Sequence, residues 1–127
     1  MFKVNFKYPS IAGEWSTLLT VNPKLTFLAL SWCDAVGGEI TITEIYRTQA
    51  MQDRYYPGGT AKSVHQYYRG IDIRVATMGA DQVRELAEDF NTAYLYDPAR
   101  PKMDSFLIHD IGHGLHLHIQ TVDGGRA

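Results

Sequence analysis

The chain has 127 residues, 45% of them hydrophobic and 20% charged, which suits one globular domain and excludes a disordered or fibrous chain. Its formal net charge at pH 7 is −2, so the overall positive field of a general nucleic-acid binder is missing. The single cysteine, Cys33, excludes an intrachain disulfide and a cysteine-rich zinc site, so any metal must be held by His, Asp or Glu.

The first third of the chain contains one clear helix signal. Residues 1–13 alternate only weakly in hydrophobicity and leave their structure open. Asn22-Pro23 then begins a helix, since Asn is a good N-cap and Pro suits the first turn. Apolar residues follow at helical spacing as far as Val36, and Gly37-Gly38 ends the helix. We expect Cys33 to be a buried packing residue of this helix rather than a nucleophile.

Strands and helices follow one another through the rest of the chain. We predict strands at 39–46, 70–76, 94–96, 106–108 and 115–122, a helix at 80–94 and a short helix within 48–56. A loop is expected at 57–59 and a turn at 112–114. The pattern indicates a single α+β domain over residues 1–127, a small and mostly antiparallel sheet with flanking helices.

Histidine is clustered near the C-terminus, where four of the five histidines fall within ten positions. In the segment LHLHIQ, residues 115, 117 and 119 are apolar and face one side of a strand, while His116, His118 and Gln120 face the other. The apolar face would pack on the core and fix the strand, so the two imidazoles of the other face could project into a cleft. Such an arrangement suits a metal site. An isolated pair of this kind is more often two surface histidines.

A second element lies upstream, where Asp72 follows His65 by seven residues. That spacing fits neither one helical face nor one straight strand, so a turn must bring the two side chains together, and Gly70 permits a close approach. Two histidines and a carboxylate, with a fourth position open to water, form a catalytic zinc arrangement. A loop histidine and a strand aspartate paired with an arginine is the ordinary alternative.

These motifs resemble the D-alanyl-D-alanine metallopeptidases, a superfamily that includes vancomycin-resistance dipeptidases, phage endolysin peptidases and the hedgehog N-terminal domain. The residues SVHQYYRGID at 63–72 are similar to the family pattern S-x-H-x-x-G-x-A-x-D, HLH at 116–118 to its second motif, and YRT at 46–48 to its arginine element. The order is the family's, over about residues 39–122. Tyr68 and Gly70 depart from the family's Gly and Ala.

The resemblance implies a role for each matching residue. His65, Asp72 and His118 would be the ligands of one Zn²⁺ ion. His116 would activate the water or steady the tetrahedral intermediate, and Arg47 would bind the substrate's carbonyl or carboxylate group. Ser63 would help to orient the site and to bind the substrate.

Other polar residues near these motifs remain open. Asp110 is a second candidate proton acceptor, although a solvated loop carboxylate is the simpler interpretation. We interpret His109 and His113 as bystanders and Glu44 as the partner of a surface ion pair. The tyrosines at 55, 56, 67 and 68 could line a peptide or glycan groove or could pack on a loop-rich edge.

The resemblance therefore predicts a zinc-dependent hydrolase, a cell-wall metallopeptidase acting on peptidoglycan stem peptides as a carboxypeptidase or as an endolysin-type endopeptidase. The alternative is a non-catalytic zinc-binding module of the same fold. We expect a monomer with no nucleic-acid partner and no membrane insertion. The sequence shows no signal peptide, so we expect synthesis in the cytoplasm and, as for a phage enzyme, action on the bacterial cell wall after release.

Overall fold

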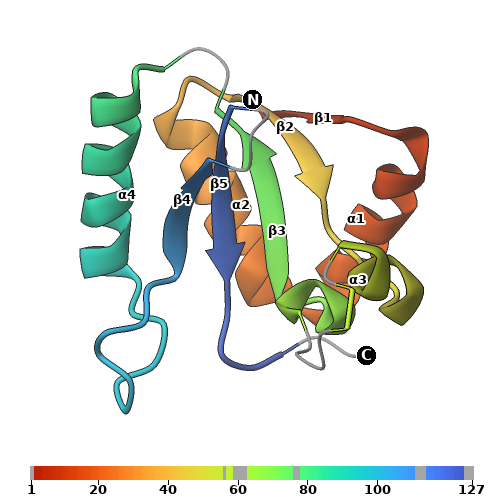
Figure 1. Cartoon of the computed structure of the whole chain (residues 1–127). Helices are drawn as coiled ribbons and strands as arrows, with labels where there is room; N and C mark the ends of the chain where they lie inside the picture. The colour runs from red at the N-terminus through yellow and green to blue at the C-terminus, as the bar shows by residue number, and fades with distance from the viewer. Residues whose placement is uncertain (1, 56, 59–62, 76–77, 111–113, 125–127) are drawn as a thin grey trace.

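The computed structural model describes residues 2–55, 57–58, 63–75, 78–110 and 114–124. It contains a five-stranded sheet with strand order β1-β2-β3-β5-β4 and four α-helices, so the predicted α+β class is confirmed (Figure 1). The strands are β1 (Lys3–Phe6), β2 (Glu39–Glu44), β3 (Gly70–Arg74), β4 (Phe106–Asp110) and β5 (Leu115–Gln120). The helices are α1 (Pro9–Val21), α2 (Pro23–Ala35), α3 (Gln49–Tyr55) and α4 (Ala80–Ala93), with a 3-10 helix η1 (Val64–Tyr67) before β3.

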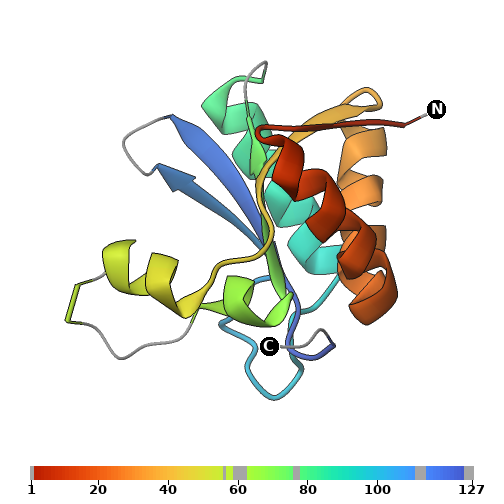
Figure 2. The ribbon, with the colours of Figure 1, turned by 90° about the vertical axis from the view of Figure 1, so that its right-hand side faces the viewer.

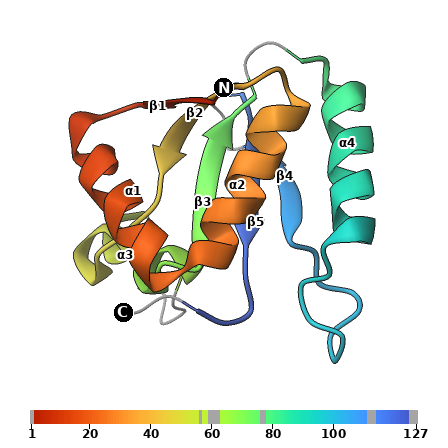
Figure 3. The same ribbon diagram turned by 180° about the vertical axis from the view of Figure 1, so that it is seen from behind.

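Helices cover one face of the sheet and leave the other face open. Seen from behind, α2 crosses β3 and β5, and α4 runs beside β4 (Figure 3). In the side view, α3 extends away from α1 and α2 (Figure 2). Apolar side chains of the strands point toward the helices, and Ile71, Ile73, Leu117 and Ile119 are fully buried there. The alternating polar residues of these strands therefore lie on the open face.

The helix predicted from Asn22-Pro23 is confirmed as α2. The Asn22 side chain accepts a hydrogen bond from the Leu25 amide at 3.2 Å, which caps the helix. Gly37 and Gly38 follow its end with positive φ angles, and Cys33 is buried within it. Among the described residues, no helix combines the length and the apolar character needed to cross a membrane.

One expected strand is wrong, and the structure defines two features that the sequence left open. The ambiguous N-terminal region contains β1 and the helix α1, whose weakly amphipathic sequence buries only Ile11 and Leu18. The strand expected at 94–96 is wrong: α4 ends at Ala93, and the chain then bends through these residues. The expected mostly antiparallel sheet is confirmed, since three of the four strand pairs are antiparallel. The fourth pair, β1 and β2, is parallel and is joined through the crossover made by α1 and α2.

Candidate metal centre

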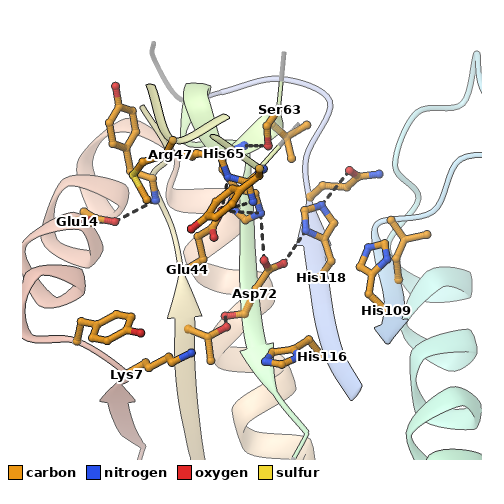
Figure 4. A pocket seen from close by; sticks show the side chains of 18 residues that line it. Lys7, Glu14, Glu44, Arg47, Ser63, His65, Asp72, His109, His116 and His118 are labelled. Carbon is orange, nitrogen blue, oxygen red and sulfur yellow. Dashed lines mark hydrogen bonds and ion pairs between the residues drawn. The ribbon is translucent and has the colours of Figure 1, made fainter. Parts of the chain in front are cut away.

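Two neighbouring strands and one short helix bring His65, Asp72 and His118 together on the open face (Figure 4). Asp72 on β3 and His118 on β5 are paired positions of the antiparallel ladder. Their chain neighbours face the core, so both side chains project to the opposite side. His65 belongs to η1, which lies just before β3 in the chain. Strand pairing thus fixes two of the three side chains, and η1 positions the third.

The turn between His65 and Asp72 depends on two residues at the positions that depart from the family pattern. Tyr68 has a φ angle of 55°, in the left-handed region that glycine adopts easily. Its carbonyl accepts a hydrogen bond from Asn22 Nδ2 at 2.9 Å, and its ring stacks on Tyr46 with centroids 4.9 Å apart. The backbone therefore takes a glycine-like conformation here although the residue is tyrosine.

Gly70 allows the close approach that its position requires. A Cβ atom on this residue would lie 2.9 Å from His118 Cε1 and would also collide with the Val64 side chain. The absence of a side chain at Gly70 thus lets η1 and the His118 ring pack against the start of β3. This agrees with the expectation that Gly70 permits a tight turn between the two candidate ligands.

The three side chains are close enough to bind one metal ion. His118 Nδ1 lies 2.8 Å from Asp72 Oδ1, and His65 Nε2 lies 3.3 Å from Asp72 Oδ2. All three donor atoms fall within 4.8 Å of one another. Donors about 2 Å from a tetrahedral zinc ion are about 3.3 Å apart, so small movements of the side chains would complete such a geometry.

Each imidazole is oriented by a hydrogen bond on its other nitrogen. His65 Nδ1 lies 3.1 Å from the carbonyl oxygen of Ile45, to which it donates, and this leaves Nε2 directed at Asp72. His118 Nε2 lies 3.1 Å from Gln120 Oε1. Gln120 Nε2 donates to the carbonyl of Asp104 at 2.9 Å, so the amide oxygen of Gln120 is the atom that faces His118. His118 therefore donates from Nε2 and directs Nδ1 at Asp72.

This arrangement of donors fits a metal ion. Two ring nitrogens and a carboxylate converge on one point. Without a metal ion, these acceptor atoms can lie so close together only if protons are shared between them. Burial alone would raise the pKa of Asp72, but hydrogen bonds from His118 and His65 outweigh it and hold this pKa well below its usual range. Burial alone would lower the pKa of His65, but the bonded carboxylate of Asp72 outweighs it and raises this pKa. A divalent ion would replace these shared protons.

Arg47 and Glu44 form a second group beside the triad. Arg47 Nε donates to Glu44 Oε1 at 2.8 Å, Nη2 also contacts this oxygen, and Nη1 donates to Gln52 at 2.8 Å. The guanidinium carbon lies 5.0 Å from the centre of the Tyr55 ring. Three of the five N–H groups of Arg47 have these partners, which leaves two for a ligand. Glu44 forms an ion pair as expected, but the pair lies on the cavity wall rather than on the outer surface, and Glu44 Oε1 is 3.7 Å from His65 Nε2.

A cavity of about 750 Å³ opens over this centre. Its walls include the triad, Arg47 and Ser63, whose Oγ accepts a hydrogen bond from the His65 amide at 3.2 Å. His116 lines it as well, and its Nδ1 lies 3.2 Å from the Gly114 carbonyl. The structure thus brings together on one cavity every residue that the sequence assigned to the site.

The structure also places His109 and Tyr55 on the cavity wall. His109, interpreted as a bystander, lines the cavity: it is the cross-strand neighbour of His116, and its ring centre lies 5.5 Å from that of His118. His113 and the centre of the 112–114 turn lie outside the described residues, as do the Asp110 side chain, Tyr56, and Gly59 of the predicted loop. Tyr55 lines the cavity, whereas Tyr67 packs beside Arg69.

The chain has no significant match among known protein families, curated proteins or solved structures. The evidence for a metal centre is therefore the geometry of His65, Asp72 and His118. The resemblance of the motifs supports only a proposal of function.

Gln120 provides a test of how the centre is oriented. We expect Gln120→Leu to lower zinc affinity by about 10- to 100-fold, because the His118 ring loses the acceptor that directs Nδ1 at the metal position. Competition with a chromophoric chelator measures the affinity. Gln82→Leu makes the same chemical change on the exposed side of α4 and should leave it unchanged. Wild-type affinity in Gln120→Leu would contradict the assigned orientation.

Proposed function

We propose that the protein is a zinc peptidase that hydrolyses amide bonds of peptidoglycan stem peptides. The observation that carries this proposal is the buried His65–Asp72–His118 cluster opening onto a cavity large enough for a short peptide. Two histidines and one carboxylate are a donor set of catalytic zinc sites, which keep one position for water or substrate. The specific substrate class comes from the resemblance of the motifs to the D-alanyl-D-alanine metallopeptidases.

His65 Nε2, Asp72 and His118 Nδ1 would hold the ion. Zinc in such a set supplies Lewis acidity, which polarises a carbonyl group and makes water nucleophilic at neutral pH. His116 Nδ1 can donate to the Gly114 carbonyl, so its Nε2 is the atom available to take a proton from water and return it to the leaving amine. His116 lies two residues before His118 on the same face, about 7 Å along β5.

Arg47 and Ser63 would act on the substrate and on the ligand geometry. The two remaining N–H groups of Arg47 can donate to the oxygen on which negative charge develops, and Glu44 and Gln52 hold the guanidinium group in place for this. Ser63 holds the backbone of His65 and so helps to position the first ligand. Arg47 and Ser63 come from the segments that flank α3, so in this proposal both would act on the substrate from the α3 side of the cavity.

The alternative, a structural zinc module, is less well supported by the geometry. Structural zinc sites are closed by four protein ligands. Here three donors converge within the described residues, and the carboxylate of Glu44, 3.7 Å from His65 Nε2, is paired with Arg47. The cluster borders a cavity rather than packed side chains.

One preparation can separate the two functions. We expect one zinc ion per chain and release of amino acids or cut cross-links from purified peptidoglycan, identified by mass spectrometry of the fragments. A chelator should abolish the hydrolysis, and added zinc should restore it. Bound zinc without hydrolysis would favour the structural module. Hydrolysis that persists after the metal has been removed would refute the zinc mechanism.

A further inference from the structure

Lys7 lies on the open face of the sheet, at the end of β1. Phe6 pairs in register with Ile42 and packs against the core, so the next residue projects to the opposite side. The Lys7 amide donates to the Ile42 carbonyl at 2.9 Å, which continues the ladder and fixes this direction. Its side chain lines the same cavity as the triad, and Figure 4 shows it extending toward Asp72.

The ammonium group of Lys7 differs from Arg47 in its partners. Arg47 is paired with Glu44, whereas none of the ion pairs among the described residues includes Lys7. Its ammonium nitrogen lies 5.3 Å from the centre of the Tyr8 ring, a contact that orients the group without neutralising it. Of the two cations on the cavity wall, Lys7 is thus the one whose charge is open to a ligand.

The charge of the cavity favours an anionic ligand once a divalent ion is bound. Among the described residues, the charged groups on its wall are two cations and three carboxylates: Lys7, Arg47, Glu14, Glu44 and Asp72. A divalent cation changes this balance from net negative to net positive. The whole chain is acidic, so the loaded cavity would be a local positive region that attracts and orients an anion.

The distance from Lys7 to the triad suits a short ligand. β1 and β3 are separated by one strand, so their backbones are about 10 Å apart. The four-carbon stem of lysine covers part of this distance toward Asp72. The remaining gap corresponds to one or two residues of extended peptide, each about 3.5 Å long.

We propose that Lys7 binds a carboxylate of the ligand, and that this carboxylate lies one or two residues beyond the group held at the metal centre. This inference rests on the proposed peptidase function and narrows it: the preferred substrates end in a free carboxylate close to the scissile bond. Lys7 is then a specificity residue, set apart from Arg47 on the β1 side of the triad.

The test compares two acyl-D-Ala-D-Ala peptides, one with a free terminal carboxylate and one with a terminal amide. We expect the zinc-loaded wild type to favour the acid in kcat/KM by about tenfold, a preference that weakens as salt is raised. Lys7→Met should remove this preference by raising KM for the acid alone, and Lys7→Arg should retain it. Lys24→Met, on the exposed surface of α2, is the matched control and should behave as the wild type.

Binding of N-acetyl-D-alanine and its amide, followed by NMR of the zinc-loaded protein, provides a second measurement that needs no turnover. If neither peptide is hydrolysed but the acid binds more tightly in a Lys7-dependent way, the peptidase proposal fails and the carboxylate site stands. If hydrolysis occurs with the same acid preference in Lys7→Met as in the wild type, Lys7 has no such role and the peptidase proposal is unaffected.

Discussion

Asp72→Asn is expected to abolish stoichiometric zinc binding and to reduce peptide hydrolysis to background. Asp72 is the central residue of the cluster, since its two oxygens face His118 at 2.8 Å and His65 at 3.3 Å. An amide of the same shape removes the negative charge and turns an N–H group toward one of the two ring nitrogens. We expect the zinc affinity to fall by more than the roughly 10- to 100-fold that is typical of losing an outer hydrogen-bond partner.

Metal content after dialysis and competition with a chelator measure this loss. Asp89→Asn makes the same change on the exposed surface of α4 and should keep one zinc ion per chain. Circular dichroism should show the same secondary structure in both variants, because Asp72 lies on the open face rather than in the core. One zinc ion bound tightly by Asp72→Asn would show that the three residues do not form the metal centre.

The part of the site that could be predicted from sequence is the part that strand periodicity controls. Alternation in the last strand placed His116, His118 and Gln120 on one face, and the full burial of Leu117 and Ile119 confirms this. The alternating pattern of β3 likewise sets Asp72 on the open face, opposite to its buried neighbours Ile71 and Ile73. The spacing of seven residues from His65 demanded a turn, and η1 together with Tyr68 provides it.

What could not be predicted depends on contacts between distant segments. His109 lies beside His116 only because β4 pairs with β5 in one particular register. Glu44 approaches His65 because β2 has an irregular register near its end, which sets Glu44 opposite Asp72. Weak alternation in residues 2–6 contained the signal for Lys7, but only the pairing of β1 with β2 brings this residue to the cavity.

Local propensity predicted a strand at 94–96 that is wrong, and it gave no clear signal for the helix α1. Tyr94, Leu95 and Tyr96 favour a strand, but Tyr96 is buried beside Arg100 of the loop that follows α4 and has no strand partner among the described residues. The helix α1 contains Gly13 and four residues with short hydroxyl side chains, which weaken its helical signal. Packing against α2 and the sheet stabilises it instead.

His116→Ala is expected to keep one zinc ion per chain and to lose about 100- to 10,000-fold in kcat, the range found when a general acid–base group is removed. The zinc should remain because His116 is two residues from His118 and outside the cluster of donor atoms. The turnover should fall because the proposed mechanism assigns the role of proton acceptor to Nε2 of this ring, which lies on the cavity wall. Zinc content and kcat measured on one preparation separate the two effects.

His109→Ala is the matched comparison, since His109 is the cross-strand neighbour of His116 on the same wall. It contacts the His118 ring from the edge strand β4, so its loss should alter KM or zinc affinity modestly and leave most of kcat. The reverse result, with His116→Ala active and His109→Ala inactive, would transfer the proton-accepting role to His109. Full activity in both variants, and in the double variant, would leave Asp110 as the next candidate, because the sequence offers it as a second proton acceptor.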